Sequence, residues 1–147
     1  MKAKLSWAIF WALVGVFITV ASLIAIPAVR EFLRGSLFIA AGALFLLLGA
    51  ALIVFTVREK VGGMLKKFLI LTGASSAGVV ISVLLHNAIY GLFIYFFGAD
   101  FWNGGDEPVF FVMSVFICPI GFLVGAVGSI VLTIKSFRIA KVSSSAQ

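Results

Sequence analysis

Residues 68–98 read FLILTGASSAGVVISVLLHNAIYGLFIYFFG, an apolar stretch without a single Asp, Glu, Lys or Arg. A helix needs about 20 apolar residues to cross the hydrocarbon core of a bilayer, which is about 30 Å thick. The stretch exceeds that length, and it lacks the alternation of apolar and polar residues that a membrane β-barrel requires. It is therefore predicted to be a transmembrane helix.

Three other stretches have the same character, at residues 5–29, 35–57 and 108–134. Backbone groups inside lipid must be satisfied within the protein, so spans of this kind form helices. We therefore predict an all-α integral membrane four-helix bundle, built from two antiparallel helical hairpins. The composition agrees, because 63% of the residues are hydrophobic and only 11% are charged, whereas about 25% are charged in typical soluble domains.

The four spans are expected to form one transmembrane domain over residues 1–141. Residues 142–147 are small and polar, and we expect them to form a disordered tail. The first span follows two lysines and resembles a signal peptide in that respect. Its apolar run is longer than the about 7–15 residues of a signal peptide's apolar region, so a retained helix is favoured.

The lysine and arginine residues are distributed unevenly between the two sides of the predicted membrane. Of the 11, only Arg30 and Arg34 follow the first span, while the other nine precede the first span or follow the second and fourth. Cytoplasmic loops carry the excess of basic residues, which predicts a multipass cell-membrane protein with both termini in the cytoplasm. The basic clusters would contact anionic lipid headgroups there. Their position at the ends of apolar runs argues against nucleic-acid binding.

The third connection, residues 99–107, is then external and carries Asp100, Asp106 and Glu107. We expect Asp106 to cap the last helix and Glu107 to favour its first turn, since Pro108 is well tolerated at a helix start. The same three carboxylates could in principle hold Ca²⁺. Their spacing matches no recognised calcium loop, so no metal is predicted.

One face of the helix over residues 68–98 is polar. Successive residues of a helix are about 100° apart, and this places seven polar side chains within an arc of about 140°. Exposed to lipid they would be unsatisfied, so the stripe should face the bundle interior or a second copy of the chain. The polar stripe consists of Thr72, Ser75, Ser76, Ser82, His86, Asn87 and Tyr90.

The last helix offers a surface that suits this stripe. Gly121, Gly125 and Ser129 follow the small-xxx-small pattern, which allows two helix backbones to approach closely. The third and fourth helices are consecutive and antiparallel, so we expect the polar stripe to face these small residues. Dimerisation through the same pattern is the alternative.

His86 is the one histidine of the sequence and lies inside a predicted span, where an ionisable side chain is a candidate for function. At about 1.5 Å per residue it lies about 16 Å below Phe97, while Cys118 lies about 15 Å below Pro108, which predicts similar depths. We favour a neutral histidine that hydrogen-bonds to a serine or asparagine of a neighbouring helix. A proton or substrate pathway is the alternative, and a metal or haem site would need a histidine from a second copy.

Cys118 precedes Pro119, which removes a backbone donor and should kink the last helix. No basic residue is nearby in sequence to stabilise a thiolate, so we interpret Cys118 as a packing residue. The sequence also lacks a Cys-x-x-Cys pair, a phosphate-binding loop and a Gly-x-Ser-x-Gly turn. We therefore predict neither a catalytic site nor a cofactor.

These features support two functional hypotheses. The first is a non-enzymatic multipass protein that acts through helix–helix contacts, in an accessory, assembly or membrane-organising role. The second is an oligomeric transporter or channel for ions or small solutes, with Ser75, Ser82, His86, Asn87 and Tyr90 along its path. A lipid-modifying enzyme is a third and weaker reading. A water-filled cavity beside the polar stripe would favour transport, and a closed interface would favour the first hypothesis.

Overall fold

The computed structural model describes residues 4–26 and 35–145, and these residues are helical with short connections. Its four helices that are long and apolar enough to cross a membrane confirm the all-α, four-helix membrane fold. The elements are α1 (Lys4–Ala25), α3 (Ser36–Arg58), α4 (Gly63–Phe97), the 3-10 helix η1 (Ala99–Trp102), α5 (Pro108–Val112), the π-helical turn η2 (Met113–Ile117) and α6 (Cys118–Ser145).

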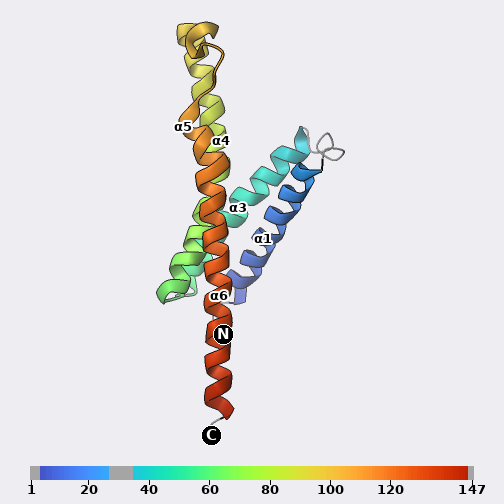
Figure 1. Cartoon of the computed structure of the whole chain (residues 1–147), viewed down its shortest axis with the longest axis vertical. Helices are drawn as coiled ribbons and strands as arrows, with labels where there is room; N and C mark the ends of the chain where they lie inside the picture. The colour runs from blue at the N-terminus through green and yellow to red at the C-terminus, as the bar shows by residue number, and fades with distance from the viewer. Residues whose placement is uncertain (1–3, 27–34, 146–147) are drawn as a thin grey trace.

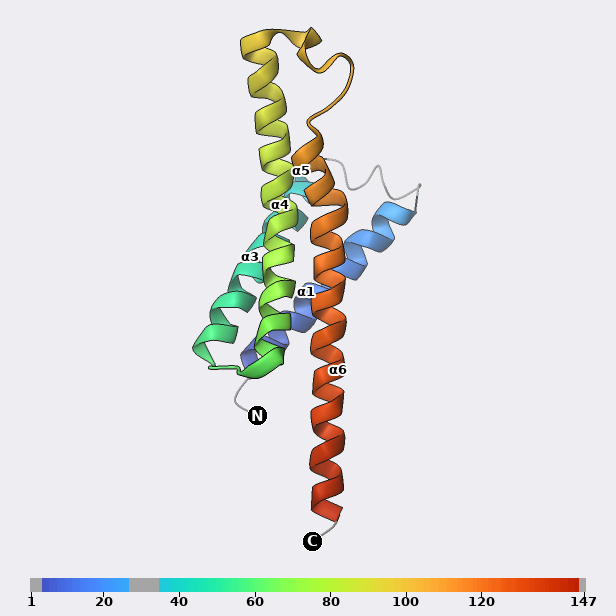
Figure 2. The same ribbon diagram turned by 60° about the vertical axis from the view of Figure 1, so that its left-hand side comes forward.

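The helices form two antiparallel hairpins. In Figure 2, α4 lies beside the continuous rod of α5, η2 and α6, and in Figure 1, α1 lies beside α3. Arg58 is the last residue of α3 and Lys60 lies in the connection to α4, and we call this side the basic end. The opposite side, where Asp106 and Glu107 precede α5, is the acidic end. Figure 1 shows the α1–α3 hairpin leaning away from α4 and α6 toward the acidic end.

The last helix is longer than the predicted span. It continues from Cys118 to Ser145, through most of the segment that we expect to be disordered, while residues 146–147 lie outside the described part. No glycine or proline follows Gly128, and extending an existing helix costs far less than nucleating one. The helix therefore continues beyond the apolar run without a break.

The apolar core lies where the two hairpins meet. Phe10, Leu13, Leu52 and Leu69 are fully buried there, with Phe122 almost so. Three aromatic rings from three different helices join the hairpins, and Phe17 stacks on Phe122 with ring centroids 4.5 Å apart. Phe45 completes this aromatic trio at 5.5 Å from Phe122 and 6.3 Å from Phe17.

A carboxylate from the basic end caps the first helix. The first backbone N–H groups of a helix have no partner within it, and Glu59 accepts hydrogen bonds from the N–H groups of Leu5 and Ser6, each at 3.1 Å. The Ser6 hydroxyl donates to the same carboxylate. The bond from the Ser6 hydroxyl holds the pKa of Glu59 below its ordinary value and outweighs the effect of desolvation. The two N–H bonds lower the pKa further.

We expect Glu59→Gln to loosen the first turn of α1. The lowered pKa means that the carboxylate supports folding at neutral pH and that this support is lost as the pH falls through that pKa. In hydrogen exchange at pH 7, the Leu5 and Ser6 amides should exchange about tenfold faster in the variant. Ser6→Ala is the matched control, since it keeps both N–H bonds and should have a smaller effect. Unchanged exchange in Glu59→Gln would show that the cap contributes nothing.

Candidate functional site

The polar stripe of α4 lies partly in a closed interface with α6. Thr72, Ser75 and Ser82 are buried. A Cβ atom added at Gly121 would lie 2.5 Å from the Ser75 hydroxyl oxygen, and one added at Gly125 would lie 2.5 Å from the Thr72 hydroxyl oxygen. The two stripes face each other at a separation that only glycine permits.

The stripe has a second partner, which no pattern in the sequence indicates. A Cβ atom at Gly49 of α3 would lie 2.7 Å from the carbonyl oxygen of Gly73, and one at Gly73 would lie 2.6 Å from that of Gly49. Beside this contact, the Ser76 hydroxyl donates to the Phe45 carbonyl at 2.6 Å. The polar residues of α4 are therefore divided between α3 and α6, and α4 is the central helix of the bundle.

Ser129 and Asn87 lie outside this arrangement of paired groups. Ser129 is fully buried, and its hydroxyl has no hydrogen-bond partner among the described residues. Asn87 is exposed, and its amide donates to the Val83 carbonyl of its own helix at 2.8 Å. The polar stripe predicts that Asn87 faces the bundle interior with the other polar residues. In the structure its side chain is exposed and bonds within α4 instead.

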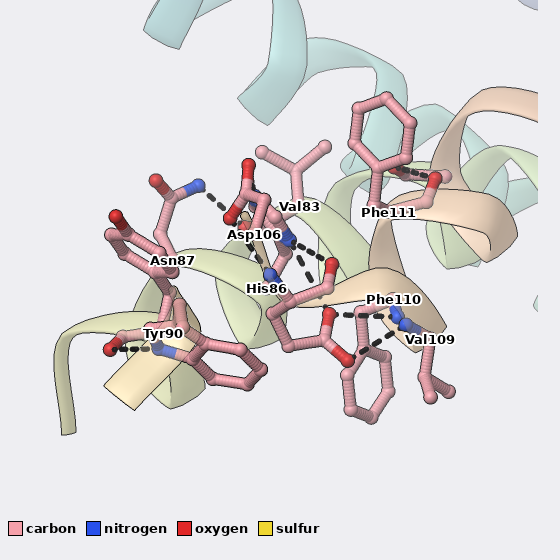
Figure 3. Close-up of polar contacts among 11 residues, drawn as sticks. Val83, His86, Asn87, Tyr90, Asp106, Val109, Phe110 and Phe111 are labelled. Atoms are coloured by element: carbon pink, nitrogen blue, oxygen red, sulfur yellow. Dashed lines mark hydrogen bonds and ion pairs between the residues drawn. The ribbon is translucent and has the colours of Figure 1, made fainter. Parts of the chain in front are cut away.

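His86 contacts the two acids that precede α5, and Figure 3 shows its contact with Asp106. Its Nδ1 lies 3.1 Å from the Glu107 carbonyl oxygen and 3.3 Å from the Glu107 carboxylate. Its Nε2 lies 3.4 Å from the Asp106 carboxylate. We call these three residues the His86 cluster. We expected His86 to bond to a serine or asparagine of a neighbouring helix. In the structure it lies beside the carboxylates of Asp106 and Glu107 instead.

Glu107 organises the His86 cluster. Its carboxylate accepts from the N–H groups of Val109 at 2.8 Å and Phe110 at 2.9 Å, so it is the cap of α5. Asp106, which we expected in that role, instead accepts from the Glu107 N–H at 2.8 Å. The reason is that Pro108 occupies the first helical position, which makes its neighbour Glu107 the capping residue.

The Glu107 side chain is 5% exposed, yet its surroundings favour the charged form. Desolvation raises its pKa, but the hydrogen bonds from the backbone of Phe110 and Val109 and from His86 outweigh desolvation and hold the pKa below its ordinary value. Asp106, by contrast, has a side chain 55% exposed. The cluster thus contains one buried, fully bonded carboxylate and one that faces outward.

His86 and Cys118 are not brought together. Cys118 lies against Gly78, where an added Cβ atom would be 2.9 Å from its sulfur. The equal depths predicted for His86 and Cys118 assumed that both helices end at the same level. In the structure α4 extends well past the start of α5, so His86 is level with Glu107 and with Phe111, whose ring centroid is 5.9 Å away.

The connection after α4 explains this offset. It folds back along the helix it leaves (Figure 2), and Trp102 stacks on Tyr90 with ring centroids 5.8 Å apart. The Trp102 indole also donates to the Tyr90 carbonyl at 3.4 Å. Tyr90 therefore anchors the returning chain, and the return brings Asp106 and Glu107 down to His86.

Pro119 is accommodated by a change of helix type. The π-helical turn η2 directly precedes Cys118, whose N–H bonds to the Met113 carbonyl five residues back. Such a turn absorbs the hydrogen bond that proline cannot donate. It also leaves Cys118 buried against α4, in agreement with a packing role.

The chemistry available to these groups is limited. Among the described residues, no three His, Cys, Asp or Glu side chains are grouped so that they could hold a metal ion. The His86 cluster pairs a base with two acids, and Cys118 lies elsewhere, against Gly78. No family model, curated protein or solved structure matches the chain.

Proposed function

We propose that this protein is a non-enzymatic multipass membrane protein that acts through contacts made within the bilayer, in an accessory, assembly or membrane-organising role. The observation that supports this most directly is the close approach of α4 to α6 along the polar stripe. At Gly121 and Gly125 there is no room for a Cβ atom, and a path for solutes would need space for water at those positions.

The hydrogen bonds of the stripe support the same proposal. The Ser76 hydroxyl donates to the Phe45 carbonyl, and the Thr72 hydroxyl donates to the Phe68 carbonyl of its own helix. Hydroxyl groups that line a water path are solvated, whereas these bond to backbone and are fully buried. The Ser76 bond joins α4 to α3, and the Thr72 bond satisfies its hydroxyl within α4, so neither hydroxyl depends on water.

The distribution of charge suggests how the bundle is placed. The basic end would face the cytoplasm and its anionic headgroups, and the acidic end the outside. The spacing along α4 agrees with a bilayer between them, because Lys66 and His86 are separated by 20 residues, or about 30 Å, the thickness of the hydrocarbon core. The His86 cluster would then lie at the outer edge of the hydrocarbon.

Flux measurements on the purified protein in liposomes test this proposal. With vesicles that report Na⁺, K⁺, H⁺, Cl⁻ and small neutral solutes, we expect no flux above that of empty vesicles, while a channel-forming peptide added at the end releases each gradient. Ser82→Ala and His86→Ala should change thermal stability or assembly only. Reproducible flux of any of these solutes that His86→Ala abolishes would overturn the proposal and establish transport instead.

A further inference from the structure

An apolar cleft lies between the two hairpins. It has a volume of about 250 Å³, and all four long helices contribute to its walls. Every residue of the lining is apolar, so the cleft offers nothing to a polar or charged molecule. Its walls include Phe17 and Val20 of α1, Gly42 of α3, Val80 and Val83 of α4, and Pro119 of α6.

The cleft results from the way the hairpins diverge. The aromatic trio of Phe17, Phe45 and Phe122 holds them together on one side of it. From there toward the acidic end α1 and α3 lean away from α4 and α6 (Figure 1), so the wall positions are no longer filled by a neighbouring helix. At Gly42 an added Cβ atom would meet nothing within 4 Å, which makes the empty space at that wall explicit.

The depth of the cleft places it within hydrocarbon. Val80 lies 14 residues from Lys66 and six from His86, or about 21 Å and 9 Å along the helix. On a hydrocarbon core of about 30 Å, the cleft therefore lies in the half nearer the acidic end. Its rim is continuous with the lipid-facing surface, because Phe38 is part of the lining and is also 51% exposed.

We propose that this cleft binds one acyl chain of a lipid from the half of the membrane nearer the acidic end. The occupant must be apolar and must enter sideways from the bilayer, because the lining is apolar and the rim is exposed at Phe38. A single hydrocarbon chain of a lipid meets both conditions and is the molecule already in contact with the rim.

Photo-crosslinking to lipid tests the proposal. The protein is reconstituted in vesicles of phosphatidylcholine that carries a diazirine in the middle of one acyl chain, and labelled peptides are identified by mass spectrometry. We expect labelling at the cleft residues of α3 and α4. Gly42→Leu adds a side chain to the cleft wall at a position where a Cβ atom meets nothing within 4 Å, and it should reduce that labelling about tenfold. Native mass spectrometry should show one retained lipid fewer.

Gly15→Leu is the matched control. Gly15 is also within a span, is exposed, does not line the cleft and has nothing within 4 Å of an added Cβ atom. Its labelling pattern should equal that of the wild type. Ala41→Phe fills the same space from the next position and serves if Gly42→Leu fails to fold. Equal labelling in the wild type and the filled variants, or crosslinks between two copies through the cleft residues, would overturn the proposal.

Discussion

Replacing Gly125 by leucine is expected to prevent the four helices from packing. A Cβ atom at this position would lie 2.8 Å from the backbone nitrogen of Thr72 and 2.9 Å from the carbonyl oxygen of Phe68. Rotation of a side chain cannot relieve contacts with backbone, so α4 and α6 would have to separate along their whole interface. Overpacking of rigid interiors costs about 1–3 kcal/mol and sometimes more, and we place Gly125→Leu at or above the upper figure.

The measurement is unfolding by sodium dodecyl sulfate from a mild detergent, followed by circular dichroism and fluorescence. Gly91→Leu provides the control, because Gly91 is also within a helix but an added Cβ atom there meets nothing within 4 Å. Both changes gain the same helix propensity, about 1 kcal/mol relative to glycine, so their difference isolates the contact. If Gly125→Leu unfolds at the same detergent fraction as Gly91→Leu, the close approach of the two helices is wrong.

The sequence predicts this interface because two independent patterns coincide. The polar face of residues 68–98 requires a partner, and Gly121 with Gly125 supplies a surface on the next helix that permits close contact. A short connection makes the two helices antiparallel. These features are local in sequence and periodic, so the fold and the α4–α6 contact can be predicted from them.

The His86 cluster could not be predicted in the same way. Its geometry depends on how far the chain returns along α4, and that is set by the packing of Trp102 on Tyr90, which no periodicity encodes. The contact between Gly49 and Gly73 could not be predicted from the sequence for a related reason. Single glycines are frequent in membrane helices, and only the crossing of α3 over α4 shows which of them touch.

The divergence of the two hairpins could not be predicted from the sequence either. All four spans are apolar on most of their surface, so the sequence does not distinguish a wall that faces lipid from one that faces another helix. The apolar cleft arises because the aromatic trio fixes the hairpins at one level, and nothing bulky fills the space beyond Gly42 and Pro119.

We expect Glu107→Gln to lower the stability of the acidic end at neutral pH. The carboxylate accepts from the N–H groups of Val109 and Phe110 and from His86, and the neutral amide accepts more weakly and from fewer donors. Loss of helix capping of this kind should reduce the melting temperature in detergent at pH 7 by about 3–8 °C. Asp100→Asn, which changes an exposed acid of η1, should leave it unchanged.

The dependence of this difference on pH decides whether the charge of Glu107 is responsible. Because the folded protein holds the pKa of Glu107 below its ordinary value, the carboxylate stabilises the fold above that ordinary value, and this contribution disappears as the pH falls through the lowered pKa. Wild type and Glu107→Gln should therefore differ at pH 7 and converge in acid, where both side chains are neutral.

His86 faces the same carboxylate, so the series is repeated in His86→Ala, in which the difference should shrink but persist through the two backbone donors. A difference between wild type and Glu107→Gln that stays constant down to pH 3.5 would mean that Glu107 acts through its shape alone and that the cap derives nothing from its charge.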